Sequence, residues 1–107
     1  MKQLSVQQLA AWLADENQSK PLLLDVREAG ELEMCCLPGV KHIPMHLIPV
    51  KHSELPSDQE IVVICHHGGR SMQVALFLEH NGLDRVHNLT GGVDAWAIAV
   101  DPTMRRY

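Results

Sequence analysis

The feature that most constrains the fold is residues 61–65, IVVIC, five consecutive residues without a charged side chain. β-Branched residues favour strands, and an apolar run without polar alternation is typical of a strand covered on both faces. Strands of this kind occur in parallel sheets that carry helices on either side. The run therefore predicts an α/β fold in which residues 61–65 form a fully buried strand.

The rest of the chain alternates between further short strands and helices. Ser5 and Gln8 have the spacing of a capping box, and the apolar pattern behind them predicts a helix over residues 6–15. We expect further strands at 22–26, 40–43 and 85–89, a helical turn within 27–34, a short helix broken by Pro49, and helices at 71–82 and 93–99. This alternation implies a mostly parallel sheet with helices on both faces.

The composition limits the classes of protein. With 107 residues and 46% hydrophobic residues, the chain predicts one domain over residues 1–107, with 101–107 as a C-terminal tail. A net charge of −4 and four aromatic side chains argue against a nucleic-acid partner. The apolar runs are shorter than the roughly 20 residues that span a bilayer, and the start lacks a signal-peptide pattern. Three cysteines, an odd number, favour reduced thiols. From the short apolar runs we expect no membrane association, and from the reduced thiols and the lack of a signal peptide we expect a cytoplasmic location.

The loop CHHGGR follows the buried strand and directly precedes a helix. Ligands of open α/β sheets bind beyond the carboxyl ends of the strands, where this loop lies. Gly68 and Gly69 permit backbone angles at which successive N–H groups turn inward, and Ser71 lies where the helix is expected to begin. The N–H groups and the helix dipole favour negative charge nearby, so Cys65 is predicted to be a reactive thiolate.

Three nitrogen-bearing side chains complete this loop. Arg70 carries a permanent fork of donors that suits an anionic substrate. His66 and His67 could add charge or move protons, or could be ordinary solvated loop residues, and the sequence leaves these alternatives open.

The loop CHHGGRS resembles the Cys-x-x-Gly-x-Arg-Ser active-site loop of the rhodanese-like sulfurtransferases, with Cys65, Gly68, Arg70 and Ser71 at the matching positions. Three further segments are similar to the family in the same order: LLLDVRE, LPGVKHIP and VHNLTGGVDAW. Together the four segments cover nearly the whole chain. The loop and the ending VDPTMRRY also resemble rhodanese domains attached to enzymes that activate small sulfur-carrier proteins.

The resemblance implies a five-stranded, mostly parallel sheet, whose first strand would be the short stretch before Ser5. It also implies that Cys65 takes a sulfane sulfur from a donor such as thiosulfate and passes it to a thiol, cyanide or a sulfur-carrier protein, without a cofactor. The amides of residues 66–71 would hold the persulfide, and Arg70 would anchor the anionic donor. Asp25 and Arg27, in the Asp-Val-Arg segment, are expected to brace the sheet end and the neighbouring loops.

One segment departs from the family pattern. Cys35 and Cys36 stand where many members have Gly-His. Adjacent cysteines are too close for an unstrained mutual disulfide, so we expect them to be structural or incidental, with a redox role or a sulfur relay with Cys65 as the alternative.

Three other functions are alternatives to sulfur transfer for these residues. A metal-binding module would use Cys65, His66 and His67 with Cys35, Cys36, His42 or His46, but neither CHH nor CC has the paired spacing of a structural zinc site. A cysteine phosphatase would have five residues between cysteine and arginine, whereas four separate Cys65 from Arg70. A non-catalytic rhodanese-like binding domain would be expected to lack the thiol.

Overall fold

The computed structural model describes residues 1–107 and contains a five-stranded parallel sheet in the order β1-β5-β4-β2-β3. The strands are β1 (Lys2–Leu4), β2 (Leu22–Asp25), β3 (Lys41–His42), β4 (Ile61–Ile64) and β5 (Val86–Leu89). β4 lies in the middle of the sheet and all four of its residues are buried, as its uninterrupted apolar run predicts. The expectation of a parallel α/β sheet with a very short first strand is confirmed.

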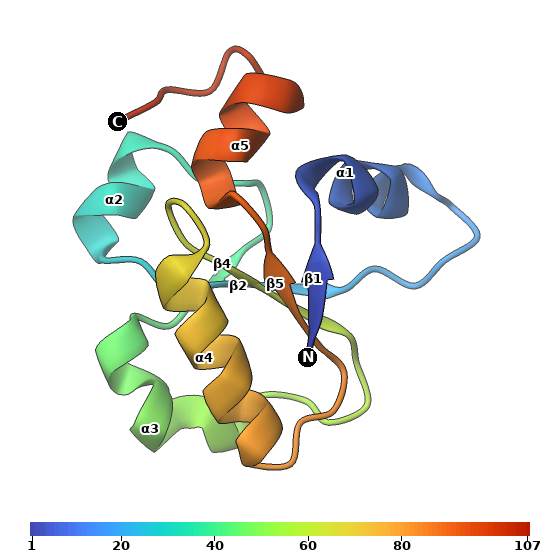
Figure 1. Ribbon diagram of the computed structural model, residues 1–107, viewed down its shortest axis with the longest axis vertical. Coiled ribbons are helices and arrows are strands. Elements are labelled where there is room, and N and C mark those ends of the chain that lie inside the picture. Colours follow the sequence, from blue (N-terminus) through green and yellow to red (C-terminus); the bar gives the residue numbers. More distant parts are fainter.

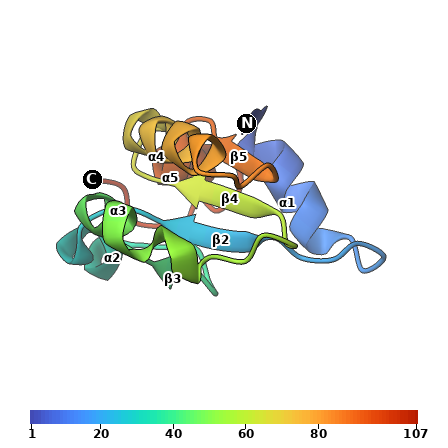
Figure 2. The ribbon, with the colours of Figure 1, turned by 90° about the horizontal axis from the view of Figure 1, so that it is seen from below.

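Helices cover both faces of this sheet, as Figures 1 and 2 show. They are α1 (Val6–Ala14), α2 (Ala29–Met34), α3 (Ile48–Lys51), α4 (Gly69–His80) and α5 (Gly92–Ala99), with short 3-10 turns at Met45–Leu47 and His52–Glu54 on either side of α3. One hydrophobic cluster packs α3 and α4 against one face, and a second packs α1 and α5 against the other. None of the helices has the length and the apolar composition that a membrane span requires.

Local signals set most of the helix ends. The capping box of α1 forms as expected, with Gln8 N donating to Ser5 Oγ at 3.1 Å and Ser5 N donating to Gln8 Oε1 at 2.9 Å. α4 ends at the Asn81-Gly82 stop signal, but it begins at Gly69, two residues before the expected start at Ser71. Gly68, with φ +106°, allows the chain to turn from the loop into the helix there.

The parallel topology brings three helix N-termini to one edge of the sheet. β2, β4 and β5 are neighbours and end on the same side, and α2, α4 and α5 begin just beyond them. Cys65 follows β4, in the middle of this arrangement. Loops from three distant parts of the chain therefore converge around the thiol.

Candidate active site

Cys65 lies at the end of β4 with its sulfur turned into the loop that follows. The backbone N–H groups of Gly68 and Ser71 donate to its Sγ atom at 3.1 and 3.3 Å. The thiol donates to Ser71 Oγ at 3.3 Å, and only 1% of the residue is exposed. Two main-chain donors and the N-terminus of α4 therefore favour negative charge on this sulfur.

The loop is held in this shape from the neighbouring helix. Gly92, with φ +59°, begins α5, and the next two amides of that helix donate to the carbonyl oxygens of Cys65 and His66 at 2.9 and 3.1 Å. A Cβ atom at position 92 would overlap both of those oxygens. The Gly-Gly turn thus allows a close backbone approach that fixes the first two loop residues, a role that the sequence alone did not indicate.

A buried polar chain runs from the thiol toward the edge of the sheet. Ser71 Oγ donates to Asn88 Oδ1 at 2.5 Å, and Asn88 Nδ2 donates to Gln3 Oε1 at 3.0 Å. Ser71 and Asn88 are both buried. Because β5 is hydrogen-bonded to β4, Asn88 lies beside the strand that carries Cys65, and it orients the serine next to the sulfur.

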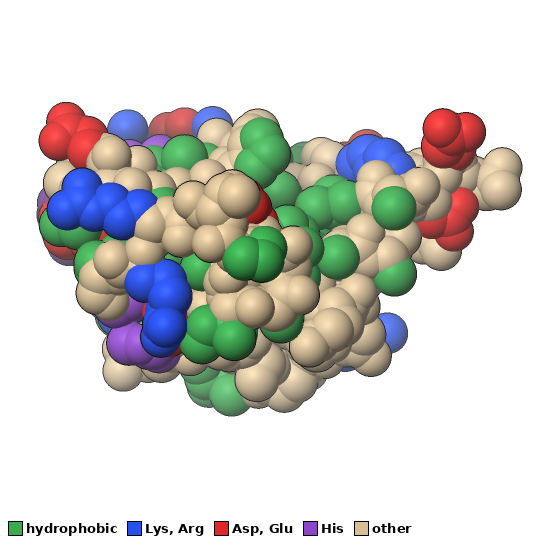
Figure 3. Space-filling model, turned by 90° about the horizontal axis from the view of Figure 1, so that it is seen from above, with side chains coloured by type: hydrophobic (Ala, Val, Ile, Leu, Met, Phe, Trp, Pro, Cys, Tyr) green, Lys and Arg blue, Asp and Glu red, His purple; other side chains and the backbone are tan.

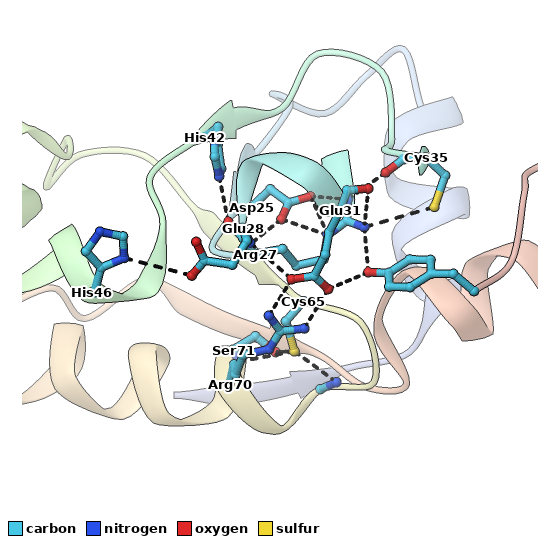
Figure 4. A network of polar contacts seen from close by, with 12 residues as sticks. Asp25, Arg27, Glu28, Glu31, Cys35, His42, His46, Cys65, Arg70 and Ser71 are labelled. Carbon is cyan, nitrogen blue, oxygen red and sulfur yellow. Dashed lines mark hydrogen bonds and ion pairs between the residues drawn. The ribbon is translucent and has the colours of Figure 1, made fainter. Parts of the chain in front are cut away.

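Asp25 and Arg27 form a completely buried ion pair beside this loop, which we call the inner ion pair (Figure 4). Arg27 Nη2 donates to Asp25 Oδ2 at 2.8 Å, and its Nε donates to Asp25 Oδ1 at 3.0 Å. Arg27 Nη2 also donates to the carbonyl oxygen of Cys35 at 2.8 Å. Burial alone lowers the pKa of Arg27, but hydrogen bonds to Asp25 and Tyr107 outweigh burial and raise the pKa overall. The pair connects the end of β2 to the segment behind α2.

Arg70 meets Glu31 in a second ion pair, nearer to solvent, which we call the outer ion pair. Its two terminal nitrogens donate to the two oxygens of Glu31 at 2.6 and 2.9 Å. The contact follows from the topology: β2 and β4 are neighbours, so the first turns of α2 and α4 lie side by side. Arg70 lowers the pKa of Glu31 to about 2, and Glu31 raises the pKa of Arg70. The donor fork expected to be available for substrate is thus engaged with a carboxylate.

Tyr107 links the two ion pairs. Its hydroxyl accepts a hydrogen bond from Arg27 Nη1 at 2.8 Å and donates one to Glu31 Oε2 at 2.7 Å. Its ring stacks on the His66 ring, with 3.8 Å between centroids and 9° between planes. Burial raises the pKa of Tyr107 to about 12. The segment 101–107, expected as a C-terminal tail, therefore packs over the site.

His66, His67 and Asp94 form the one group of at least three side chains placed closely enough to hold a metal ion. The two histidine rings lie against each other, with centroids 3.9 Å apart. Asp94 is already paired with Arg106 at 2.9 Å and lies 3.8 Å from His67 Nε2. These contacts account for the group without an ion, and Cys65 is not part of it.

Histidine and basic side chains gather on the left of Figure 3, the side on which the C-terminal segment lies in Figure 1.

His66, His42, Cys35 and Cys36 lie in separate environments. Burial and the neighbouring His67 lower the pKa of His66, which favours the neutral form of its ring. His42 Nε2 lies 2.6 Å from the carbonyl oxygen of Arg27. Cys35 is partly buried and Cys36 is exposed, and both are free thiols. The ligand set expected of a metal-binding module does not assemble around Cys65.

Of the residues that the sequence nominated, Gly68 and Ser71 contact the Cys65 sulfur directly. The others lie in the same loop or beside it: His66, His67, Gly69, Arg70 and the inner ion pair of Asp25 and Arg27. The residues that sequence reasoning missed are Glu31, Asn88, Gly92 and Tyr107. The strand order could have suggested Glu31, since it predicts that α2 and α4 begin side by side, whereas the position of Tyr107 has no local sequence signal.

Comparisons with known proteins agree with this geometry. Residues 5–99 match the family described as the rhodanese-like domain. A sulfurtransferase of Allochromatium vinosum is 38% identical over 97 residues, which are 91% of this chain and 89% of that protein. A chloroplastic rhodanese-like/PpiC domain-containing protein of Arabidopsis thaliana is 37% identical over all of this chain, which spans only 38% of its length.

Solved structures share the whole architecture. A rhodanese-like domain protein from Staphylococcus aureus superposes with a TM-score of 0.84 at 30% identity, over 100% of this chain and 99% of that one. The CHHGGRS loop, the strand order and the match over residues 5–99 lead to the same assignment, and the chain belongs to the rhodanese-like domain family.

Proposed function

We propose that this protein is a sulfurtransferase that carries a sulfane sulfur on Cys65. The main supporting observation is that one thiol lies at the end of β4 with the amides of Gly68 and Ser71 aimed at its sulfur. Such donors stabilise the thiolate before the reaction and the charged persulfide after it. Membership of the rhodanese-like family supports the same chemistry.

In the first half-reaction the Cys65 thiolate attacks the outer sulfur of a donor such as thiosulfate. A new S–S bond forms on Cys65, the S–S bond of the donor breaks, and sulfite leaves with the bonding electron pair. In the second half-reaction a thiol, cyanide or a sulfur-carrier protein attacks the outer sulfur of the persulfide and releases the Cys65 thiolate. Neither half-reaction needs a further oxidant or reductant, so we propose no cofactor.

The other loop residues would serve this exchange in distinct ways. The amides between His66 and Ser71 would hold the outer sulfur of the persulfide, and Arg70 would bind the charged end of an anionic donor. Asp25 and Arg27 would support the loop from behind. Three free cysteines suit a reducing compartment, and we propose the cytoplasm.

Intact-mass measurement tests this function directly. After treatment with thiosulfate, the protein should gain one sulfur atom, and cyanide or a thiol should remove it. Cys65→Ser should gain none, while Cys36→Ser, a change at an exposed thiol, should still gain it. A full sulfur gain by Cys65→Ser, or no gain by the wild-type protein with any sulfane donor, would refute the proposal.

A further inference from the structure

Arg70 presents the edge of its guanidinium that is formed by the two terminal nitrogens to Glu31, and not to open solvent. Both terminal nitrogens donate to Glu31, at 2.6 and 2.9 Å. This two-pronged geometry is the one by which arginine binds carboxylates and oxyanions. Glu31 therefore occupies the place that the sulfonate end of thiosulfate would take.

Glu31 is itself held firmly. Besides the two contacts from Arg70, Oε1 accepts from the N–H of Glu28 at 3.1 Å and Oε2 accepts from the hydroxyl of Tyr107 at 2.7 Å. Its side chain is 17% exposed and that of Arg70 is 36% exposed. A partly buried carboxylate with four donors is a strong competitor for the arginine, because an incoming anion must displace a fixed charge of the same sign.

No second cation near the sulfur replaces Arg70. Arg27 is fully buried, and its donors are shared among Asp25, the backbone of the Cys35 segment and Tyr107. Figure 4 places Arg70 and Glu31 beside Cys65. A dianionic donor that binds the two terminal nitrogens of Arg70 has to displace a carboxylate, while a donor that needs only the loop amides does not depend on Arg70.

We propose that Glu31 is a positioning residue that sets donor specificity through Arg70, so that the site favours the persulfide of a thiol over thiosulfate. This inference rests on the proposed sulfur transfer by Cys65. The Cys65 thiolate bonds to the outer sulfur of R–S–S–H, the donor S–S bond breaks, and the thiolate RS⁻ leaves with the electron pair. The donor's proton remains on the transferred sulfur, which is now the persulfide of Cys65.

Steady-state kinetics with two donors test this specificity. The probes are thiosulfate and the persulfide of N-acetylcysteamine, which has no charged group apart from its sulfur. Glu31→Gln removes the charge but keeps an oxygen that can accept from Glu28 N, so the start of α2 is retained. It should lower the KM for thiosulfate by about tenfold, since a competing charge-assisted contact is lost, with kcat and the persulfide KM little changed.

Glu33→Gln is the matched control. Glu33 lies exposed on the same helix, and its replacement changes the net charge by the same amount. It should leave both KM values at the wild-type level. An equal fall in the thiosulfate KM with Glu33→Gln would mean that the general field of the protein, and not the outer ion pair, limits thiosulfate.

A second variant with a smaller change can be measured if Glu31→Gln folds poorly. Tyr107→Phe removes one of the four donors to Glu31 and should lower the thiosulfate KM in the same direction, by about twofold. An unchanged or raised thiosulfate KM in both variants overturns the specificity role of Glu31. If neither thiosulfate nor the persulfide loads sulfur on Cys65 in the wild-type protein, that result would instead contradict the proposed function.

Discussion

The two ion pairs beside Cys65 use the same chemical groups in opposite settings. The inner ion pair, Asp25 and Arg27, comes from two residues of one short segment and is completely buried. The outer ion pair, Glu31 and Arg70, joins residues 39 positions apart and remains partly exposed. A buried charge without its partner is costly, whereas a partly solvated one can exchange partners. The inner pair is therefore suited to support the site, and the outer pair is suited to respond to substrate.

The largest expected effect is loss of the inner ion pair. Arg27→Met should lower the free energy of unfolding by about 3–5 kcal/mol, because it leaves the Asp25 carboxylate buried and unpaired. Arg70→Met should cost about 1 kcal/mol or less, because Glu31 can be hydrated. Chemical denaturation of both variants measures the difference.

The double variant Asp25→Asn with Arg27→Met separates charge from packing. It should be more stable than Arg27→Met alone, because no unpaired charge remains in the interior. If Arg27→Met and Arg70→Met lower the free energy of unfolding equally, the inner pair contributes no more to stability than the outer pair.

The next effect concerns the backbone support of the loop. Gly92→Ala should destabilise the protein by about 1–3 kcal/mol, because its Cβ would overlap the carbonyl oxygens of Cys65 and His66. It should also slow sulfur loading, since the loop must shift to make room. Gly30→Ala is the control: Gly30 lies in α2 with nothing near its Cβ position and should be neutral or stabilising. A Gly92→Ala protein with wild-type stability and loading rate would show that the close approach is not needed.

The difference between the pairs also explains what the sequence could predict. The inner pair lies within the Asp-Val-Arg segment, and the thiol, the glycines and the helix start lie within residues 65–71. Features that close in sequence follow from local rules: an apolar run predicts the strand, and Gly68 permits the turn. The parallel sheet with helices on both faces and the position of the Cys65 loop could therefore be predicted from local patterns, whereas the short first strand of the five was implied only by the family resemblance.

The outer pair could not be anticipated in the same way. From the sequence alone, Glu31 is an ordinary helix residue and Arg70 is a free hydrogen-bond donor. Their contact can be predicted only once β2 and β4 are known to be neighbours. Tyr107 lies 76 positions from Glu31, and nothing in the tail sequence fixes the path that brings its hydroxyl there. Partners so distant in sequence depend on tertiary packing, which periodicity does not encode.

A smaller effect should appear in the pH dependence of stability. Arg70 lowers the pKa of Glu31 to about 2 from an ordinary value of 4.5. The ionised pair therefore stabilises the folded state above about pH 4.5, and this contribution is lost as the pH falls from 4.5 toward 2. Glu31→Gln should weaken the acid dependence of the free energy of unfolding by about 1 kcal/mol after solvent screening, while Glu33→Gln retains more of it. If the free energy of unfolding falls equally with decreasing pH in the wild type and in Glu31→Gln, the outer pair is not formed in solution.

An effect of similar size to that at Glu31 is expected where the two pairs meet. Tyr107→Phe keeps the ring on His66 but removes the hydroxyl that accepts from Arg27 and donates to Glu31, so it should cost about 0.5–1.5 kcal/mol. A double-mutant cycle with Glu31→Gln should give a coupling energy above about 0.5 kcal/mol, because both changes alter the same hydrogen bond. If the two effects add, the tyrosine only covers the site. If the two effects are coupled, the Tyr107 hydroxyl, which is bonded to Arg27 of the inner pair, holds in place the Glu31 carboxylate that competes for Arg70.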